Sequence, residues 1–270
     1  IINESYFLTS SRKNSKIDKF NVRPLLYSYI EKFKIIIIFI DLIRCIVLLR
    51  KKNIKTIFCL TEPYILVSYF LAKIFKAKLL LMIHGTYGAS TFYSKDKKLY
   101  KKAFTYSNRI LTVSNYSKNI FCDLWGHYNK TDIAYNGADN NLFKYSNQVR
   151  KEKLFIFVGH IKKRKGLIPS LKAFCLFAKK YPDYKFEIIS EPGYDSHPDY
   201  EKQVINLVNS SKSISFVGKL SINELVLKYQ KCFCNVLISV PDKRNFEGMG
   251  MVHLEANLCG SLTIGGKNTA

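Results

Sequence analysis

Two carboxylates, Glu247 and Glu255, bracket seven residues in the segment NFEGMGMVHLEANLCG, residues 245–260. Glycines at 248 and 250 let the backbone approach a ligand, and a helix starting beside them offers unpaired N–H groups. A phosphate at those groups would place a ribose near one carboxylate and a sugar ring near the other. A solvent-facing loop acid and an ordinary helix surface charge are the alternatives, which spacing alone does not exclude.

A basic loop forms a second candidate site. The strand-like run LFIFVG, residues 154–159, leads into HIKKRKG, and a helical pattern starts near Leu167. Four cations therefore lie between the carboxyl end of a strand and the amino end of a helix, where an anion is favoured. They are Lys162, Lys163, Arg164 and Lys165. The alternative is a solvated basic loop in a basic protein.

Composition and charge limit the classes of protein. The 270 residues are 47% apolar and 23% charged, which is typical of a globular chain and not of a disordered one. The 43 basic and 20 acidic residues give a net charge of +23, which favours nucleotide phosphates, nucleic acid or an anionic membrane as partners. Seven scattered cysteines form no CxxC pair, so we expect buried, reduced thiols in a cytosolic protein.

The apolar segment KIIIIFIDLIRCIVLLRKK, residues 34–52, raises the question of a membrane span. Its apolar stretch of about fifteen residues is shorter than the roughly 20 that a span needs, and it contains Asp41 and Arg44. The pattern favours a basic amphipathic helix that is buried on one side and contacts lipid headgroups on the other.

Short β-rich runs alternate with helical patterns along the chain. Strands are predicted at residues 5–10, 55–61, 78–84, 109–114, 131–136, 154–159, 184–190, 213–218, 235–239 and 261–265. Helices are predicted at residues 28–50, 64–76, 94–107, 115–124, 166–181, 199–211, 221–232 and 249–259. Within the last helix, Met251, Leu254 and Leu258 follow helical spacing and are expected to face the core, and Gly260 suits a C-cap. The alternation predicts an α/β fold, with parallel sheets covered by helices on both faces.

A polar stretch without apolar periodicity divides this pattern into two halves. It predicts an N-terminal domain over residues 1–140, a linker over 141–153 and a C-terminal domain over 154–270. We expect two Rossmann-like domains with a cleft between them. Ligands of such sheets bind beyond the carboxyl ends of the strands, so the loops after the strands carry the candidate sites.

Several segments resemble one enzyme family, in the same order along the chain. EGMGMVHLEANLCGSLTIGG resembles the two-glutamate motif of the retaining, nucleotide-sugar-dependent glycosyltransferases of family 4, which have the GT-B fold. FVGHIKKRKG and SISFVGKLSINELVLKYQKCFCNVLIS resemble the family's strand–glycine–basic loop and a later strand–helix–strand segment. LLLMIHG, RILTVSNYSKNIF and IAYNGADNNLF resemble family segments of the first domain. The resemblance covers residues 55–270 and implies two Rossmann-like domains facing across a cleft.

The resemblance implies a role for each glutamate and for the amides between them. Glu255 would bind the ribose hydroxyls of the donor, and Glu247 would bind hydroxyls of the transferred sugar. The backbone amides of Gly250, Met251 and Val252 would face the sugar or the diphosphate.

The basic loop would hold the diphosphate. Lys165 matches the family lysine that neutralises the leaving diphosphate. Gly159 ends the preceding strand, and His160 stands where the family has an arginine, so Lys163 or Arg164 would share the diphosphate with Lys165.

The resemblance further implies that His84, at the end of LLLMIHG, would face the sugar across the cleft. A structural histidine after a buried strand is the alternative. Such enzymes need no divalent metal, and the chain has no Asp-x-Asp segment to hold one. We therefore expect no metal and no cofactor, because the nucleotide sugar is a substrate.

This chain also departs from the family pattern. The family's Gly-x-Gly after the next strand appears as Ser190-Glu191-Pro192-Gly193. The first strand and glycine-rich loop are expected before Ile1, and closing strands and a final helix after Ala270. We therefore expect a family member that is truncated at both ends.

The leading hypothesis is a retaining, metal-independent glycosyltransferase that moves a sugar from a UDP- or GDP-linked donor to a cell-surface polysaccharide or lipid-linked acceptor. We expect it in the cytoplasm, peripheral on the inner face of the cell membrane, with an anionic membrane surface as a further partner. An inactive remnant with at most weak nucleotide binding is the alternative. A nucleic-acid-binding protein is disfavoured, because the basic residues are spread along the chain without a binding motif.

Overall fold

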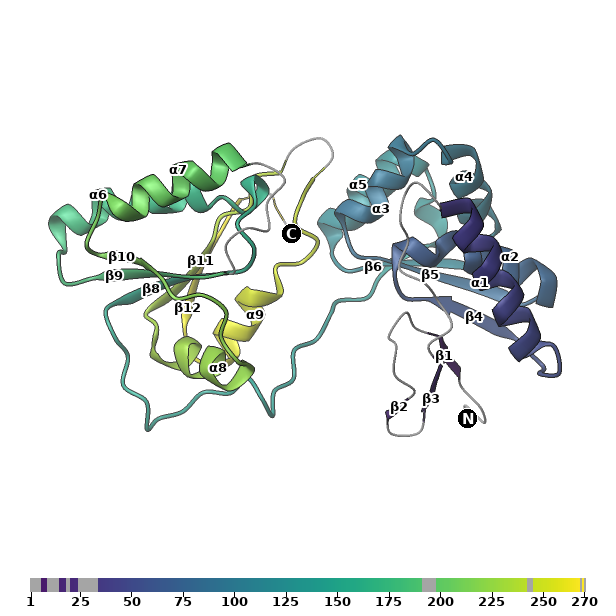
Figure 1. Ribbon diagram of the computed structural model, residues 1–270, viewed down its shortest axis with the longest axis horizontal. Helices are drawn as coiled ribbons and strands as arrows, with labels where there is room; N and C mark the ends of the chain where they lie inside the picture. Colours follow the sequence, from purple (N-terminus) through teal and green to yellow (C-terminus); the bar gives the residue numbers. More distant parts are fainter. Residues whose placement is uncertain are drawn as a thin grey trace. The chain divides into compact units, whose positions relative to one another are not determined.

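The chain folds into two compact units, each built around its own parallel sheet (Figure 1). The computed structural model describes residues 6–8, 15–17, 20–23, 34–190, 198–241, 245–267 and 269. The first unit comprises Ile1–Thr112 and Ile120–Ile133, and the second comprises Val113–Asn119 and Ala134–Ala270. The parallel sheets flanked by helices confirm the predicted α/β class.

The first unit contains a four-stranded parallel sheet in the order β4-β5-β6-β7. Its strands are β4 (Thr56–Cys59), β5 (Lys78–Ile83), β6 (Arg109–Thr112) and β7 (Thr131–Ile133). Its helices are α1 (Lys34–Leu49), α2 (Ile65–Phe75), α3 (Thr86–Ser90), α4 (Lys97–Tyr106) and the part of α5 (Asn115–Trp125) from Ile120 onward, with short 3-10 turns at η2 (Glu62–Tyr64), η3 (Thr91–Tyr93) and η4 (Tyr128–Lys130). Alternate residues of β5, namely Leu79, Leu81 and Ile83, are buried in one apolar core with α1, α2, α4 and α5.

A small three-stranded sheet precedes α1. It consists of β1 (Tyr6–Leu8), β2 (Ser15–Ile17) and β3 (Phe20–Arg23) in the order β1-β3-β2. The strand predicted at residues 5–10 contains β1, whereas β2 and β3 were not predicted. The helix predicted from residue 28 has its first six residues outside the described part of the chain.

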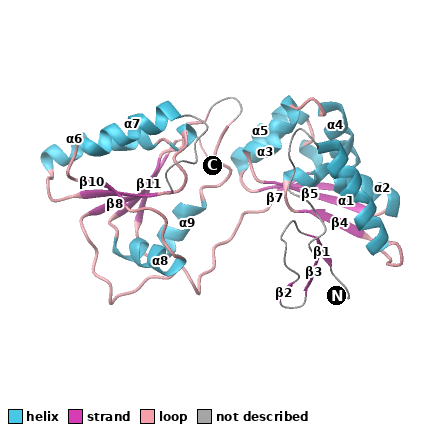
Figure 2. Cartoon of the chain, in the orientation of Figure 1, coloured by secondary structure: helices cyan, strands magenta, loops and turns pink. Residues whose placement is uncertain are grey.

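The second unit contains a five-stranded parallel sheet in the order β10-β9-β8-β11-β12 (Figure 2). Its strands are β8 (Leu154–Val158), β9 (Lys185–Ile189), β10 (Ile214–Phe216), β11 (Cys234–Leu237) and β12 (Leu262–Gly265). Between them lie η5 (Lys163–Lys165), α6 (Leu167–Lys180), α7 (Pro198–Asn209), α8 (Ile222–Lys231) and α9 (Met251–Leu258). The winding reverses between β8 and β11, and that is the switch point where Rossmann-like sheets bind ligands.

The central strand of this sheet is buried on both faces. Phe155 and Phe157 pack in one core with α6 and α7, whereas Leu154, Ile156 and Val158 pack in a second core with α8 and α9. Figure 1 shows these two helix pairs on opposite sides of the sheet. Burial on both faces requires a continuous apolar run, which is the pattern that made this strand recognisable in the sequence.

Helix α9 is rotated relative to the prediction. Ala256 and Cys259 are fully buried and face the sheet, whereas Met251 and Leu254 are only half-buried. Leu258 packs against the core as expected.

The cysteines and the glycine after α9 follow expectation. All seven cysteines are free thiols, and each is buried except Cys175, which is half-buried. Burial raises the pKa of Cys59 to about 11, so this thiol is protonated and inert near neutral pH. Gly260, the predicted C-cap glycine, has a φ of +79°.

Gly166 allows two strand-end loops of the second unit to touch. Its φ is +64°, and a Cβ atom there would collide with the carbonyl oxygen of Ile238. We expect Gly166→Ala to lower the free energy of unfolding by at least about 2 kcal/mol, because left-handed strain adds to a backbone clash.

Gly218→Ala is the matched control, because its φ is +83° but its Cβ would meet open space. Strain alone should cost this variant about 1 kcal/mol. Urea unfolding of both variants measures the difference, and equal losses would contradict the clash.

Candidate functional site

Two loops meet at the switch point of the second unit. One joins β8 to α6 and contains η5, and the other joins β11 to α9. The backbone N–H of Val240 donates a hydrogen bond to the carbonyl oxygen of Arg164, at 2.8 Å. With the close approach of Gly166 to Ile238, this bond holds the two loops together where ligands of such sheets bind.

Glu247 joins the two loops through its side chain. Its Oε2 atom lies 2.5 Å from an Arg164 guanidinium nitrogen and 3.1 Å from Lys165 Nζ. The three side chains are mostly buried, with exposed fractions of 15% for Glu247, 23% for Arg164 and 13% for Lys165. Gly159, with a φ of +130°, lies beneath the end of the Lys165 side chain. The structure therefore brings together four of the predicted site residues.

The cluster keeps Glu247 ionised. Burial alone would raise the pKa of Glu247, but the charges and hydrogen bonds of Lys165 and Arg164 outweigh burial and hold that pKa below its usual value. Two cations and one carboxylate leave one net positive charge. The cluster is thus arranged to receive an anion without losing its internal ion pairs.

Helix α9 begins directly after this cluster. Gly250 precedes it in a left-handed conformation, with φ +65° and ψ +53°, and no side chain of the described residues caps this end. The first-turn amides of Met251 and Val252 therefore point out of the helix start without a side-chain acceptor. Free amides at a helix start favour a phosphate or another anion.

Glu255 lies on α9 and is held by Tyr229 of α8. The Tyr229 hydroxyl donates a hydrogen bond to Glu255 Oε2 at 3.0 Å, and Tyr229 is fully buried. Burial raises the pKa of Glu255, and the hydrogen bond from Tyr229 opposes part of that rise. Burial and the charge of Glu255 raise the pKa of Tyr229, so the phenol remains a donor.

His253 lies on the same helix and was not singled out in the sequence. Its Nδ1 atom is buried without a hydrogen-bond partner, and burial lowers the pKa of its imidazole. The ring lies beside Gly265 at the end of β12. It is therefore a neutral, incompletely paired group beside the strand ends.

His84 and His160 complete the predicted set. His84 belongs to the first unit, where it follows β5 and is half-buried. Its backbone N–H donates to Glu62 Oε1 at 2.6 Å, and its Nε2 lies 2.7 Å from the Leu60 carbonyl oxygen. His160 is exposed beside Gly159. The altered loop at residues 191–193 lies outside the described residues.

Three polar residues with a place in these networks escaped the sequence analysis: Tyr229, His253 and Glu62. Tyr229 lies on the apolar face of an amphipathic helix, so the sequence suggests only a packing role. Its hydroxyl could have indicated a polar contact, because a buried tyrosine usually needs a hydrogen-bond partner. Glu62 lies in the loop after β4, at the carboxyl end of a strand, where ligands of such sheets bind.

The chain is similar in sequence to known glycosyltransferases. Residues 139–269, slightly less than half of the chain, match the model of the family glycosyl transferases group 1. An uncharacterized glycosyltransferase of Haemophilus influenzae is 25% identical over 156 residues, which cover 57% of this chain and 40% of that relative. The chain thus aligns with less than half the length of this curated relative.

Particular solved structures share the architecture. HepE from Anabaena, in complex with UDP and glucose, aligns with a TM-score of 0.70 and 16% identity over 92% of this chain and 67% of its own. Sucrose-phosphate synthase from Thermosynechococcus elongatus aligns with a TM-score of 0.72 and 17% identity over 91% of this chain and 65% of its own. At such identities the likeness shows the fold, and the predicted GT-B fold is confirmed.

The ion cluster predicts a specific pH dependence of stability. Because the folded pKa of Glu247 is below its usual value, its ionised form stabilises the protein above the unfolded pKa, and this stabilisation is lost as pH falls through the folded pKa. We expect Glu247→Gln to lower stability by about 1.5–3 kcal/mol at pH 7, and by less as pH falls below about 4.5.

Thermal melts of both proteins across that range measure the difference. Glu152→Gln serves as control, because it removes an exposed ion pair with Lys231. A wild-type advantage over Glu247→Gln that stays constant down to pH 3 would contradict the assignment.

Proposed function

We propose that this chain is the donor-binding and transferring part of a glycosyltransferase. It moves a sugar from a nucleotide-sugar donor, UDP- or GDP-linked, to a cell-surface polysaccharide or lipid-linked acceptor, with retention and without a metal. The observation that carries the proposal is the Glu247–Arg164–Lys165 cluster at the switch point, directly before the uncapped start of α9. The family match over residues 139–269 supports it independently.

The leaving diphosphate fits the positive side of this site. Lys165 and Arg164 contribute the net charge, and the amides of Met251 and Val252 contribute hydrogen-bond donors. In a water-poor site such preorganised donors stabilise the charge that develops on the leaving group. These are the groups of this chain that would bind the diphosphate.

The two glutamates fit a sugar and a ribose because, among the described residues, each contacts its partners through one oxygen. Both cations contact Glu247 through Oε2, and Tyr229 contacts Glu255 through Oε2. In each case Oε1 is left to accept hydrogen bonds from ligand hydroxyls. We assign Glu247 to the transferred sugar and Glu255 to the ribose.

UDP is the donor nucleotide to test first. HepE, which shares the fold, has been solved in complex with UDP and glucose. Nothing in the described residues of this chain selects uracil over guanine, so GDP-sugars belong in the same panel.

Nucleotide binding and transfer test the site together. Calorimetric titration with UDP and GDP, and donor turnover with a panel of UDP- and GDP-sugars, should show losses of about 10- to 100-fold for Lys165→Ala and Glu255→Ala. Each variant removes a charged contact to the donor. Lys172→Ala, an exposed lysine on α6, should behave like the wild type.

The outcomes separate the alternatives. Binding without turnover by the wild type would favour the inactive remnant over the enzyme. Equal affinities and rates in wild type, Lys165→Ala and Glu255→Ala would contradict the site assignment.

We further propose that α1 lies on an anionic membrane surface. Its outer face carries a stripe of exposed apolar side chains at helical spacing: Ile36, Phe39, Ile40, Ile43 and Val47. Phe39 is 63% exposed and Val47 58% exposed. The exposed basic residues 50–52 follow the helix directly. An apolar stripe beside basic residues is the pattern of helices that lie in the lipid interface.

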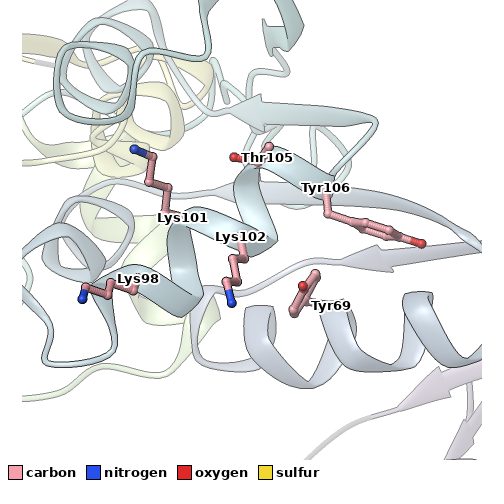
Figure 3. Close-up of a pocket in the computed structure, with 6 residues that line it drawn as sticks. All are labelled: Tyr69, Lys98, Lys101, Lys102, Thr105 and Tyr106. Atoms are coloured by element: carbon pink, nitrogen blue, oxygen red, sulfur yellow. The ribbon is translucent and has the colours of Figure 1, made fainter.

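A basic groove lies in the same unit (Figure 3). It has a volume of about 550 Å³ and is lined by Tyr69, Lys98, Lys101, Lys102, Thr105 and Tyr106. Figure 3 shows the lysines along α4, with Tyr69 across from them on α2. Helix α2 packs against both α1 and α4. Lysines in such a groove offer contacts to lipid phosphates, in keeping with a lipid-linked acceptor.

Flotation with liposomes tests the membrane proposal. Among the described helices, none has the length and apolarity to cross a bilayer, so only surface binding is proposed. We expect binding to anionic vesicles that weakens with salt, and a loss of about tenfold for Phe39→Glu, since this side chain would leave the lipid interface.

Leu176→Glu is the matched control, because Leu176 is 68% exposed on α6 of the other unit. It should bind vesicles like the wild type. Absence of wild-type flotation at low salt, or equal losses in both variants, would contradict the role of α1.

A further inference from the structure

Glu62 is a buried carboxylate at the edge of the first unit's sheet. It begins η2, three residues after the last residue of β4, and is 5% exposed. Strands β4 and β5 are adjacent and parallel, so the loops that follow them lie at the same edge. Glu62 therefore stands beside the loop that carries His84.

Backbone amides surround this carboxylate. The His84 N–H donates to Oε1 at 2.6 Å, and the N–H groups of Gly85 and of Glu62 itself also face the carboxyl group. Burial raises the pKa of Glu62, while these amides and His84 oppose that rise. A buried acid is costly unless hydrogen bonds compensate, and here they come mainly from the turn after β5.

The same segment also binds the imidazole of His84. Nε2 lies 2.7 Å from the carbonyl oxygen of Leu60, two residues before Glu62. A carbonyl oxygen only accepts hydrogen bonds, so Nε2 must carry the proton. In the neutral ring Nδ1 then holds the lone pair. The segment from Leu60 to Glu62 thus binds His84 at its backbone and at its ring.

We propose that Glu62 is a positioning residue, which holds the His84 turn so that the ring donates from Nε2 to Leu60 and presents Nδ1 as an acceptor for a substrate hydroxyl. The substrate part rests on the proposed glycosyltransferase function. The positioning part rests on the contacts of the first unit alone.

Removal of the carboxyl group would uncouple these contacts. In Glu62→Ala the buried N–H groups of His84 and Gly85 lose their acceptor, and the turn must move to find another. The ring then no longer stays aligned with Leu60. In Glu62→Gln the side-chain oxygen still accepts from His84, so the conservative variant should rescue the alignment.

Nuclear magnetic resonance of the ¹⁵N-labelled histidine rings tests the positioning without an activity assay. His84→Gln identifies the signals of His84 among the five histidines of the chain. We expect the Nε2–H tautomer in the wild type and in Glu62→Gln, and a mixture of tautomers in Glu62→Ala. A wild type without the Nε2–H tautomer, or a Glu62→Ala that keeps it as the single form, overturns the proposal. If Glu62→Ala does not fold, the wild type is compared with Glu62→Gln alone. Loss of the Nε2–H tautomer of His84 in Glu62→Gln would also overturn the proposal.

Kinetics then test the substrate part. We expect kcat to fall by about 10- to 100-fold in Glu62→Ala and to recover in large part in Glu62→Gln, because misplacement of a contacting group acts on the chemical step. UDP affinity should stay at the wild-type value, since the assigned nucleotide contacts belong to the second unit. An unchanged kcat in Glu62→Ala overturns the substrate part. A wild type that neither binds UDP nor transfers sugar defeats the proposed function, while the tautomer result still decides the role of Glu62.

Discussion

The ion pairs between Glu247 and the two cations of η5 organise the second unit. They connect loops that are far apart in the sequence, and they do so at the one place where the winding of the sheet reverses. The backbone bond from Val240 to Arg164 runs alongside them. Without the carboxylate, two partly buried positive charges would repel each other. Glycines at 159, 166 and 250 complete the arrangement, because each has a positive φ that would strain a residue with a side chain.

The first unit repeats this construction with different partners. Glu62 follows β4 and binds the loop after the neighbouring strand, as Glu247 binds the loop after β8. The partners are backbone amides in one case and side-chain cations in the other. In each unit a buried carboxylate, Glu62 or Glu247, lies where adjacent strands end and binds the loop after the neighbouring strand. The difference matters for chemistry, since only the cluster around Glu247 has an excess of positive charge.

Periodicity and composition predicted the large sheets well, because β8 and its neighbours must be apolar on both faces. The loop that carries Glu247 was predicted because ligands of such sheets bind beyond the carboxyl ends of the strands, and the family resemblance added the roles of its residues. The strands β2 and β3 escaped prediction because they are only three or four residues long. The rotation of α9 and the bond from Tyr229 to Glu255 depend on neighbouring elements. Such contacts between elements cannot be predicted from the local sequence.

The contacts of Glu247 and Glu255 through Oε2 determine which hydrogen-bond donors a ligand must offer. Within the described part of the chain, the partners of Glu247 and Glu255 contact Oε2, so a bound molecule that covers either Oε1 must donate a hydrogen bond to it. Under the proposed assignment, a deoxynucleotide would desolvate Glu255 with fewer hydroxyls to offer in return. Discrimination between ribonucleotide and deoxyribonucleotide donors would then depend on Tyr229, because its buried hydroxyl decides which oxygen of Glu255 remains for the nucleotide.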